Sequence, residues 1–124
     1  MRPETTEPAM YEPVLLREPA VGINVERSDR RAAVTLSGEV DMLVEADIIR
    51  SVTHAASLPG LDGLHIDTSK VTFIDSSGLR SLLLSRQAAI DRGLRFSLAV
   101  VDHGAVARLL VLAGLYDELA PEIV

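Results

Sequence analysis

The sequence contains no cysteine and no tryptophan, and only 3% of its residues are aromatic. Without cysteine, the chain has no disulfide framework, no thiol nucleophile and no thiolate metal site. Long apolar runs are also missing, because none approaches the roughly 20 residues that a membrane-spanning helix requires. The start of the chain lacks the apolar core of a secretion signal. We therefore expect a cytoplasmic protein that is not inserted in a membrane.

Positive charge is also scarce. The 12 basic residues face 18 acidic ones, and the formal net charge is −6 at pH 7. This charge disfavours binding to nucleic acid, whose backbone is itself negative. What is present suits a small folded domain, since 48% of the 124 residues are hydrophobic and 24% are charged. That length supports one core without cross-links and is too short for two comfortable domains.

Prolines are concentrated at one end of the chain. Four of the six fall within residues 1–19, set among glutamates and without a periodic apolar pattern. Such a segment buries too little apolar surface to order itself. We therefore predict a flexible leader over residues 1–19, with Leu15 and Leu16 as its one docking point, and a folded domain over residues 20–124.

After the leader, the apolar pattern alternates between periods typical of strands and of helices. The predicted elements are strands at 21–26 and 34–36, a helix at 44–56, a strand at 64–74, a helix at 79–90, a strand at 94–100, a helix at 104–113 and a short turn or strand within 115–124. This order predicts a single α/β domain with a mixed sheet. Right-handed crossovers would place the helices mainly on one face of that sheet.

Several details of the pattern are specific enough to be checked. The second strand is expected to stop at Ser37-Gly38, and Asp41 is expected to cap the helix that follows. In the helix at 79–90, Ile90 is expected to point inward, whereas Ser85 and Arg86 are expected to point outward.

The run Asp75-Ser76-Ser77-Gly78 lies where a strand ends and a helix begins. A helix N-terminus offers unpaired N–H groups and a partial positive charge, which suit either a capping side chain or a phosphoryl group. Enzyme motifs fit the spacing poorly. A nucleophile elbow needs glycine where Ile74 stands, and a phosphate-binding loop needs a glycine-rich setting that Lys70 lacks. An aspartic-protease pair needs a second copy of the motif.

Metal chemistry finds no support in the pattern either. The three histidines, His54, His65 and His103, do not show the helical spacing of a metal clamp, so we expect them to be structural. An acidic group opens the first predicted helix. It consists of Glu39, Asp41, Glu45 and Asp47. These acids either compensate the helix dipole or form a docking edge.

Three blocks of sequence resemble the STAS domain of bacterial anti-sigma-factor antagonists. They are Val34–Asp41, Ile66–Leu79, and Ala107–Leu110 with Ala113-Gly114-Leu115, and they follow the family's order across residues 21–120. The resemblance implies a non-enzymatic α/β domain without a cofactor. It also implies a role: the domain binds a kinase-type anti-sigma factor and so releases a sigma factor for transcription.

The same resemblance assigns roles to individual residues. Ser76 is the serine that the anti-sigma factor kinase phosphorylates with ATP, and a PP2C-type phosphatase reverses that step. Asp75 shapes recognition, and Ser77 and Gly78 open the helix. Arg80 departs from the small residue common in the family, and it either pairs with the phosphate or faces solvent.

By the same resemblance, Gly38, Glu39 and Asp41 belong to the neighbouring loop where the partner docks. Two alternatives keep the fold: a structural subunit packed on the ATPase of a lipid-transport complex, and a scaffold of a stress-signalling assembly. A third is a serine hydrolase that uses Ser76, Asp75 and a histidine.

Overall fold

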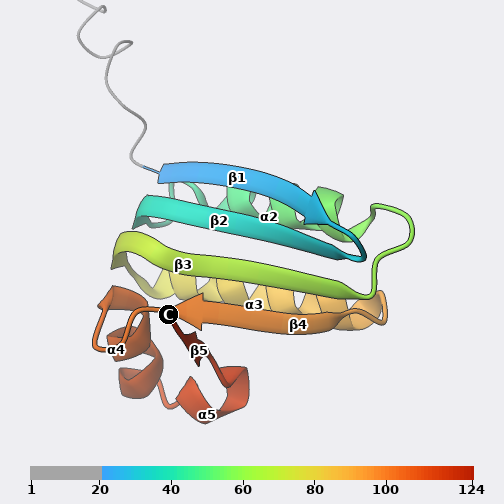
Figure 1. Cartoon of the computed structure of the whole chain (residues 1–124). Coiled ribbons are helices and arrows are strands. Elements are labelled where there is room, and N and C mark those ends of the chain that lie inside the picture. The colour runs from blue at the N-terminus through green and yellow to red at the C-terminus, as the bar shows by residue number, and fades with distance from the viewer. Residues whose placement is uncertain (1–20) are drawn as a thin grey trace, which may run out of the picture.

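The computed structural model describes residues 21–124, which form one five-stranded sheet with helices packed against it (Figure 1). The predicted leader at 1–19 lies outside the described residues. The strands are β1 (Val21–Ser28), β2 (Arg31–Val40), β3 (Gly63–Ile74), β4 (Arg95–Val100) and β5 (Glu122–Ile123). The helices are α2 (Glu45–Ala56), α3 (Ser76–Asp91), α4 (Ala105–Leu112) and α5 (Tyr116–Leu119).

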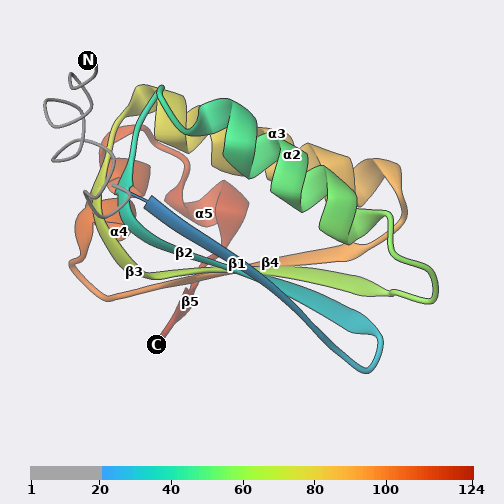
Figure 2. The ribbon, with the colours of Figure 1, turned by 90° about the horizontal axis from the view of Figure 1, so that it is seen from above.

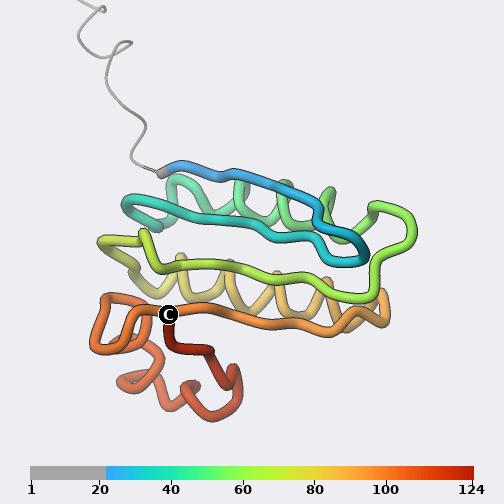
Figure 3. The backbone as a smooth tube through the Cα atoms, in the orientation of Figure 1, coloured from blue at the N-terminus to red at the C-terminus, as the bar shows by residue number. Residues whose placement is uncertain are grey.

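The strands lie in sequence order across the sheet, and the sheet is mixed, as predicted. β1 and β2 form an antiparallel hairpin, whereas the pairs β2–β3, β3–β4 and β4–β5 are parallel. Figure 3 shows the first four strands running side by side, with the C-terminal segment returning beside β4. The register of the parallel strands aligns Arg31 with Gly63 and Gly63 with Arg95.

Seen from above, α2 and α3 lie side by side over one face of the sheet (Figure 2). The opposite face carries no helix in the part of the chain that the structure describes. Alternate residues of β2 explain this layering, because Ala32, Val34 and Leu36 are fully buried toward the helices. Ile48 of α2 and Leu82 of α3 are fully buried in the same core. Among residues 21–124, no helix combines the length and apolar character needed to cross a membrane.

The second strand extends further than predicted. β2 continues through Ser37 and Gly38 to Val40, and its pairing with β3 shifts register between Thr35 and Ser37 and again between Gly38 and Glu39. Gly38 adopts a positive φ of 87°, which glycine tolerates without the cost that a side chain would add. The predicted stop at Ser37-Gly38 is therefore wrong: β2 continues through this glycine, and the extra residue at each irregularity lies in β3.

The predicted cap at Asp41 is also wrong. α2 begins at Glu45 after Val44, which makes no side-chain cap. The Asp41 carboxylate instead accepts a hydrogen bond from the backbone N–H of Leu43 at 3.0 Å. Asp41 thus closes a local turn between β2 and α2, a common use of an aspartate side chain outside a helix.

The buried face of α3 differs from the predicted one. Ser85 is 1% exposed and Ile90 is 46% exposed, so the expected inward Ile90 and outward Ser85 are both wrong. Small residues at helical spacing, Gly78, Ser81, Ser85 and Ala89, line the buried side. Their size lets α3 pack closely, and each serine hydroxyl is satisfied by a carbonyl of its own helix at 2.6 Å.

Candidate functional site

The candidate site lies at the carboxyl ends of β2 and β3, where each strand leads toward a helix. Val40 and Ile74 face each other at the last register position of the two strands. The backbone N–H of Asp75 donates to the Val40 carbonyl oxygen at 3.3 Å. Because parallel strands deliver their carboxyl ends to the same edge, the 41–44 loop and the start of α3 are neighbours.

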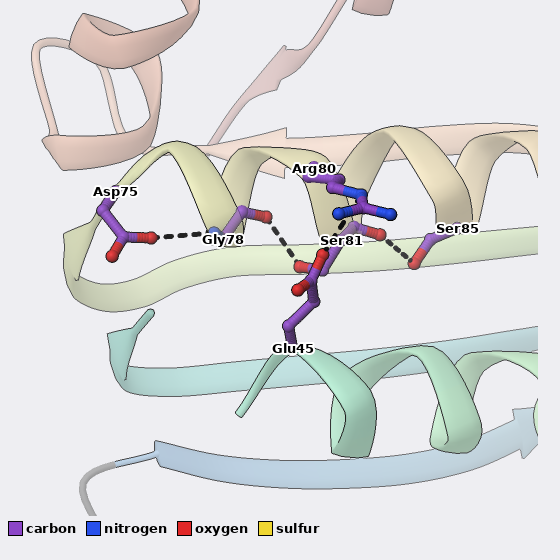
Figure 4. A network of polar contacts seen from close by, with 6 residues as sticks. All are labelled: Glu45, Asp75, Gly78, Arg80, Ser81 and Ser85. Carbon is purple, nitrogen blue, oxygen red and sulfur yellow. Dashed lines mark hydrogen bonds and ion pairs between the residues drawn. The ribbon is translucent and has the colours of Figure 1, made fainter. Parts of the chain in front are cut away.

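Asp75 caps α3 and leaves Ser76 at the surface. The Asp75 backbone is extended, and its carboxylate accepts a hydrogen bond from the Gly78 N–H at 2.9 Å (Figure 4). Ser76 is the first residue of the 16-residue helix and is exposed, whereas Ser77 is half-buried. The capping role at this junction therefore belongs to the aspartate, and the Ser76 side chain is accessible to a partner.

Gly78 sets how closely α3 approaches the end of the sheet. A Cβ at this position would lie 2.7 Å from Ile74 Cγ1 and 2.8 Å from Val40 Cγ1, and it would also meet the Val40 carbonyl oxygen. These separations are far below van der Waals contact, so only glycine fits. Gly78 thereby fixes the placement of Ser76 over the ends of β2 and β3.

Arg80 reaches across to α2. Its Nε lies 3.4 Å from Glu45 Oε2, although 70% of the Arg80 side chain is exposed (Figure 4). Glu45 is 21% exposed, and its Oε2 is buried without a hydrogen bond among the described residues. Arg80 is thus largely exposed to solvent, while its charge stabilises the buried carboxylate oxygen of Glu45.

The Arg80→Ala variant is expected to lower the free energy of unfolding by about 1 kcal/mol, because a buried carboxylate oxygen loses its cation. Adding Glu45→Met should recover most of that loss, since it removes the stranded charge. Arg86→Ala is the matched control on the same helix, because its contact with Glu118 is longer, at 3.8 Å, and the Glu118 side chain is 56% exposed. Urea unfolding of the four proteins measures the effect, and equal losses in the two arginine variants would contradict it.

Three exposed apolar side chains come from the segments at this end of the sheet. Leu43 is 80% exposed, Met42 is 70% exposed and Phe73 is 49% exposed. The first two lie in the loop after β2, and Phe73 lies at the end of β3 opposite Glu39. Several exposed apolar side chains at the same end of the sheet as an accessible serine are typical of a surface that contacts another protein.

Residues 23–121 match the family model described as Mlab, STAS domain. The chain belongs to the STAS domain family. No curated protein sequence matches it significantly.

Solved structures agree with this assignment. An anti-sigma factor antagonist from Mycobacterium paratuberculosis is 25% identical, with a TM-score of 0.72 over 82% of this chain and 85% of that one. RsbS of Moorella thermoacetica, with a serine changed to glutamate, is 24% identical, with a TM-score of 0.67 over 82% and 86% of the two chains. The phosphorylated Bacillus cell fate determinant SpoIIAA is 18% identical, with a TM-score of 0.59 over 77% and 86%. The last two likenesses concern the fold alone.

The structure gathers most of the predicted site residues of this STAS domain at one end of the sheet. Gly38 and Glu39 lie near the end of β2, on either side of a register shift with β3, and precede the Asp41 turn. Asp75, Ser77 and Gly78 open α3 beside them, with Arg80 one turn further along.

The remaining candidates stay apart. His54 lies in α2, His65 in β3 and His103 before α4, and residues 21–124 form no group of three or more metal-ligating side chains. The acidic residues at the start of the first predicted helix do not act together either. Asp47 pairs with Arg50 at 2.8 Å, whereas Glu45 pairs with Arg80.

Sequence reasoning missed Met42, Leu43 and Phe73. Met42 and Leu43 precede a helical stripe, so they resemble the beginning of its buried face. Their position relative to the helix distinguishes Met42 and Leu43 from core residues. The buried residues of α2 are Ile48, Val52, Ala55 and Ala56, whereas the two loop residues come before the helix begins at Glu45.

Proposed function

We propose that this STAS domain is an anti-sigma-factor antagonist that binds a kinase-type anti-sigma factor and is switched off by phosphorylation of Ser76. The observation that carries the proposal is the position of Ser76, exposed as the first residue of α3 beside the apolar Met42 and Leu43. The similarity to the antagonist from Mycobacterium paratuberculosis supports it, because that match extends over 85% of that chain.

The surface around Ser76 suits a partner whose apolar centre is surrounded by polar groups. Exposed Leu43 and Met42 supply apolar contact, and Glu39, Asp41 and Asp75 place carboxylates around them. An apolar centre with a polar rim is the usual composition of a specific interface. The partner-binding residues are therefore those of the 38–43 segment and the first turn of α3.

Phosphorylation of Ser76 would leave the fold intact and change the surface. Phosphoserine adds about −1.5 to −2 charges, and the helix N-terminus tolerates negative charge. A partner carboxylate about 6 Å away would be repelled by about 3 kcal/mol per charge pair at an effective dielectric constant near 20. That energy corresponds to a loss of roughly a hundredfold in affinity. A PP2C-type phosphatase would restore the binding form.

Two baits, Ser76→Ala and Ser76→Glu, test the proposal in a pull-down from the native host, with bound proteins identified by mass spectrometry. We expect the alanine bait to retain an ATP-binding anti-sigma factor and the glutamate bait to lose it. Ser57→Ala and Ser57→Glu are matched controls, because Ser57 is an exposed serine at the C-terminal end of α2, outside the proposed docking surface. Both of these controls should retain the partner.

The captured kinase then identifies the acceptor. With purified kinase and ATP, labelling should disappear in Ser76→Ala and persist in Ser77→Ala. Loss of labelling in Ser77→Ala alone would overturn the assignment of Ser76. If both Ser76 baits retained the same membrane ATPase or one very large assembly, the domain would be a structural subunit or a scaffold, and Ser76 would have no switching role.

A further inference from the structure

The sheet face that α2 and α3 leave uncovered carries two arginines in register. Arg31 of β2 and Arg95 of β4 both face Gly63 of β3, so the two side chains flank a position that has none. Arg31 and Arg95 alternate with Ala32 and Phe96, which belong to the core side, and this alternation places both guanidinium groups on the uncovered face.

A cavity of about 230 Å³ lies between these arginines. Arg31, Gly63, Arg95, Ser97 and Asp62 are among its lining residues. The Asp62 carboxylate accepts a hydrogen bond from Arg30 Nε at 2.9 Å. Within residues 21–124, no carboxylate forms an ion pair with either Arg31 or Arg95. The cavity therefore carries an excess of positive charge on an otherwise acidic protein.

His65 borders the same region. Its Nδ1 lies 2.6 Å from the Ser97 hydroxyl oxygen, and Ser97 lines the cavity. Burial lowers the pKa of His65, and the nearby charge of Arg31 lowers it further. The carboxylates of Glu122 and Asp67 act on this pKa in the opposite direction. His65 therefore lies beside the cavity, where an added charge would change its pKa.

We propose that this cavity binds the phosphate group of a small soluble phosphate ester. The planar guanidinium group of an arginine donates two hydrogen bonds to two oxygens of one phosphate. Two arginines on opposite sides therefore hold one phosphate between them. A phosphate occupies roughly the volume of two or three waters, at about 30 Å³ each, so room remains for part of the attached ester. The missing side chain of Gly63 leaves the floor of the cavity open to the ligand.

The proposed site is separate from the Ser76 surface. Gly63 begins β3 and Ile74 ends it, and the 12 residues of that strand extend over about 35–40 Å. Phosphate binding at Gly63 thus neither requires nor blocks partner docking at Ser76. The two proposals can fail independently.

NMR titration of the three histidines tests the site. Glycerol 3-phosphate should raise the pKa of His65, because a bound anion favours the protonated imidazole. The same change should be absent for His54 and His103, which are exposed and lie on α2 and before α4. Sodium chloride at matched ionic strength controls for screening. No change at His65, or an equal change with chloride, would overturn the proposal.

Three variants sharpen the test. Arg31→Gln and Arg95→Gln should each weaken glycerol 3-phosphate binding about tenfold or more, because each removes a charge-assisted hydrogen bond. Gly63→Ala should also weaken it, since the new methyl group fills the floor while its nearest neighbours lie at an ordinary 3.6 and 3.7 Å. Arg50→Gln, which removes an exposed arginine of α2, should leave binding unchanged.

A comparison with inorganic phosphate tests whether the cavity prefers a phosphate ester to the free phosphate ion. The proposal expects glycerol 3-phosphate to bind more tightly than inorganic phosphate, because the cavity exceeds the volume of the phosphate alone. Equal affinities would overturn the assignment to an ester. An equal loss of affinity in Arg50→Gln and Arg31→Gln would overturn the assignment to this cavity.

Discussion

The Gly78→Ala variant is expected to lose roughly 3 kcal/mol or more of its free energy of unfolding, the upper part of the range for overpacked cores. The added Cβ would lie 2.7 Å from Ile74 Cγ1 and 2.8 Å from Val40 Cγ1. It would also press on the Val40 carbonyl oxygen, which accepts the Asp75 N–H and cannot move without breaking that bond. The start of α3 must therefore shift away from the sheet.

Urea and thermal unfolding measure this effect, and we expect the melting temperature to fall by more than about 10 °C for a domain of this size. Helix propensity alone would make alanine better than glycine by about 1 kcal/mol, so the sign of the change is informative. Gly63→Ala is the matched control, because its nearest neighbour is 3.6 Å away. Unchanged or increased stability of Gly78→Ala would contradict the close approach of α3 to Val40.

Placing aspartates at Met42 and Leu43 together is expected to weaken binding of the anti-sigma factor about a thousandfold. Each side chain is at least 70% exposed in the free protein, so the fold does not depend on either. Central apolar contacts of an interface are commonly worth about 2 kcal/mol each, and two carboxylates buried there would add a desolvation cost. Four kcal/mol corresponds to about a thousandfold.

Isothermal titration with the purified partner measures the loss, and thermal unfolding checks that the fold persists. Leu112→Asp is the control, because Leu112 is 84% exposed but belongs to α4. It should bind the partner normally. Normal binding by the Met42→Asp/Leu43→Asp variant would place the docking surface elsewhere, even if Ser76 proved to be phosphorylated.

The Ser76 region was predictable because its signal is local. A strand end, an aspartate, two serines and a glycine are consecutive, and the structure places a capped helix start there. The local sequence could not predict which side chain caps the helix, because the choice between Asp75 and a serine depends on backbone angles. The continuation of β2 through Gly38 escaped prediction for a similar reason, because a glycine ends a strand or lies within it according to the pairing of its neighbours.

Features that depend on register could not be predicted from the sequence. Arg31, Gly63 and Arg95 are far apart along the chain, and only the alignment of three strands brings them together. The same holds for Arg80 and Glu45, whose contact depends on how α2 packs beside α3. Ser85 looked like a surface residue because a hydroxyl is polar, yet its own helix satisfies that hydroxyl.

The register of β3 also constrains the order in which the chain folds. Its partners in β2 and β4, exemplified by Arg31 and Arg95, are both 32 residues away from Gly63 in sequence, whereas Ser28 pairs with Arg31 across a tight turn. Hairpins close in about 1–10 μs, but pairings across long loops pay a larger entropy of closure. The β1–β2 hairpin can therefore form early, whereas β3 pairs with β2 and β4 only after the long connections between these strands have closed.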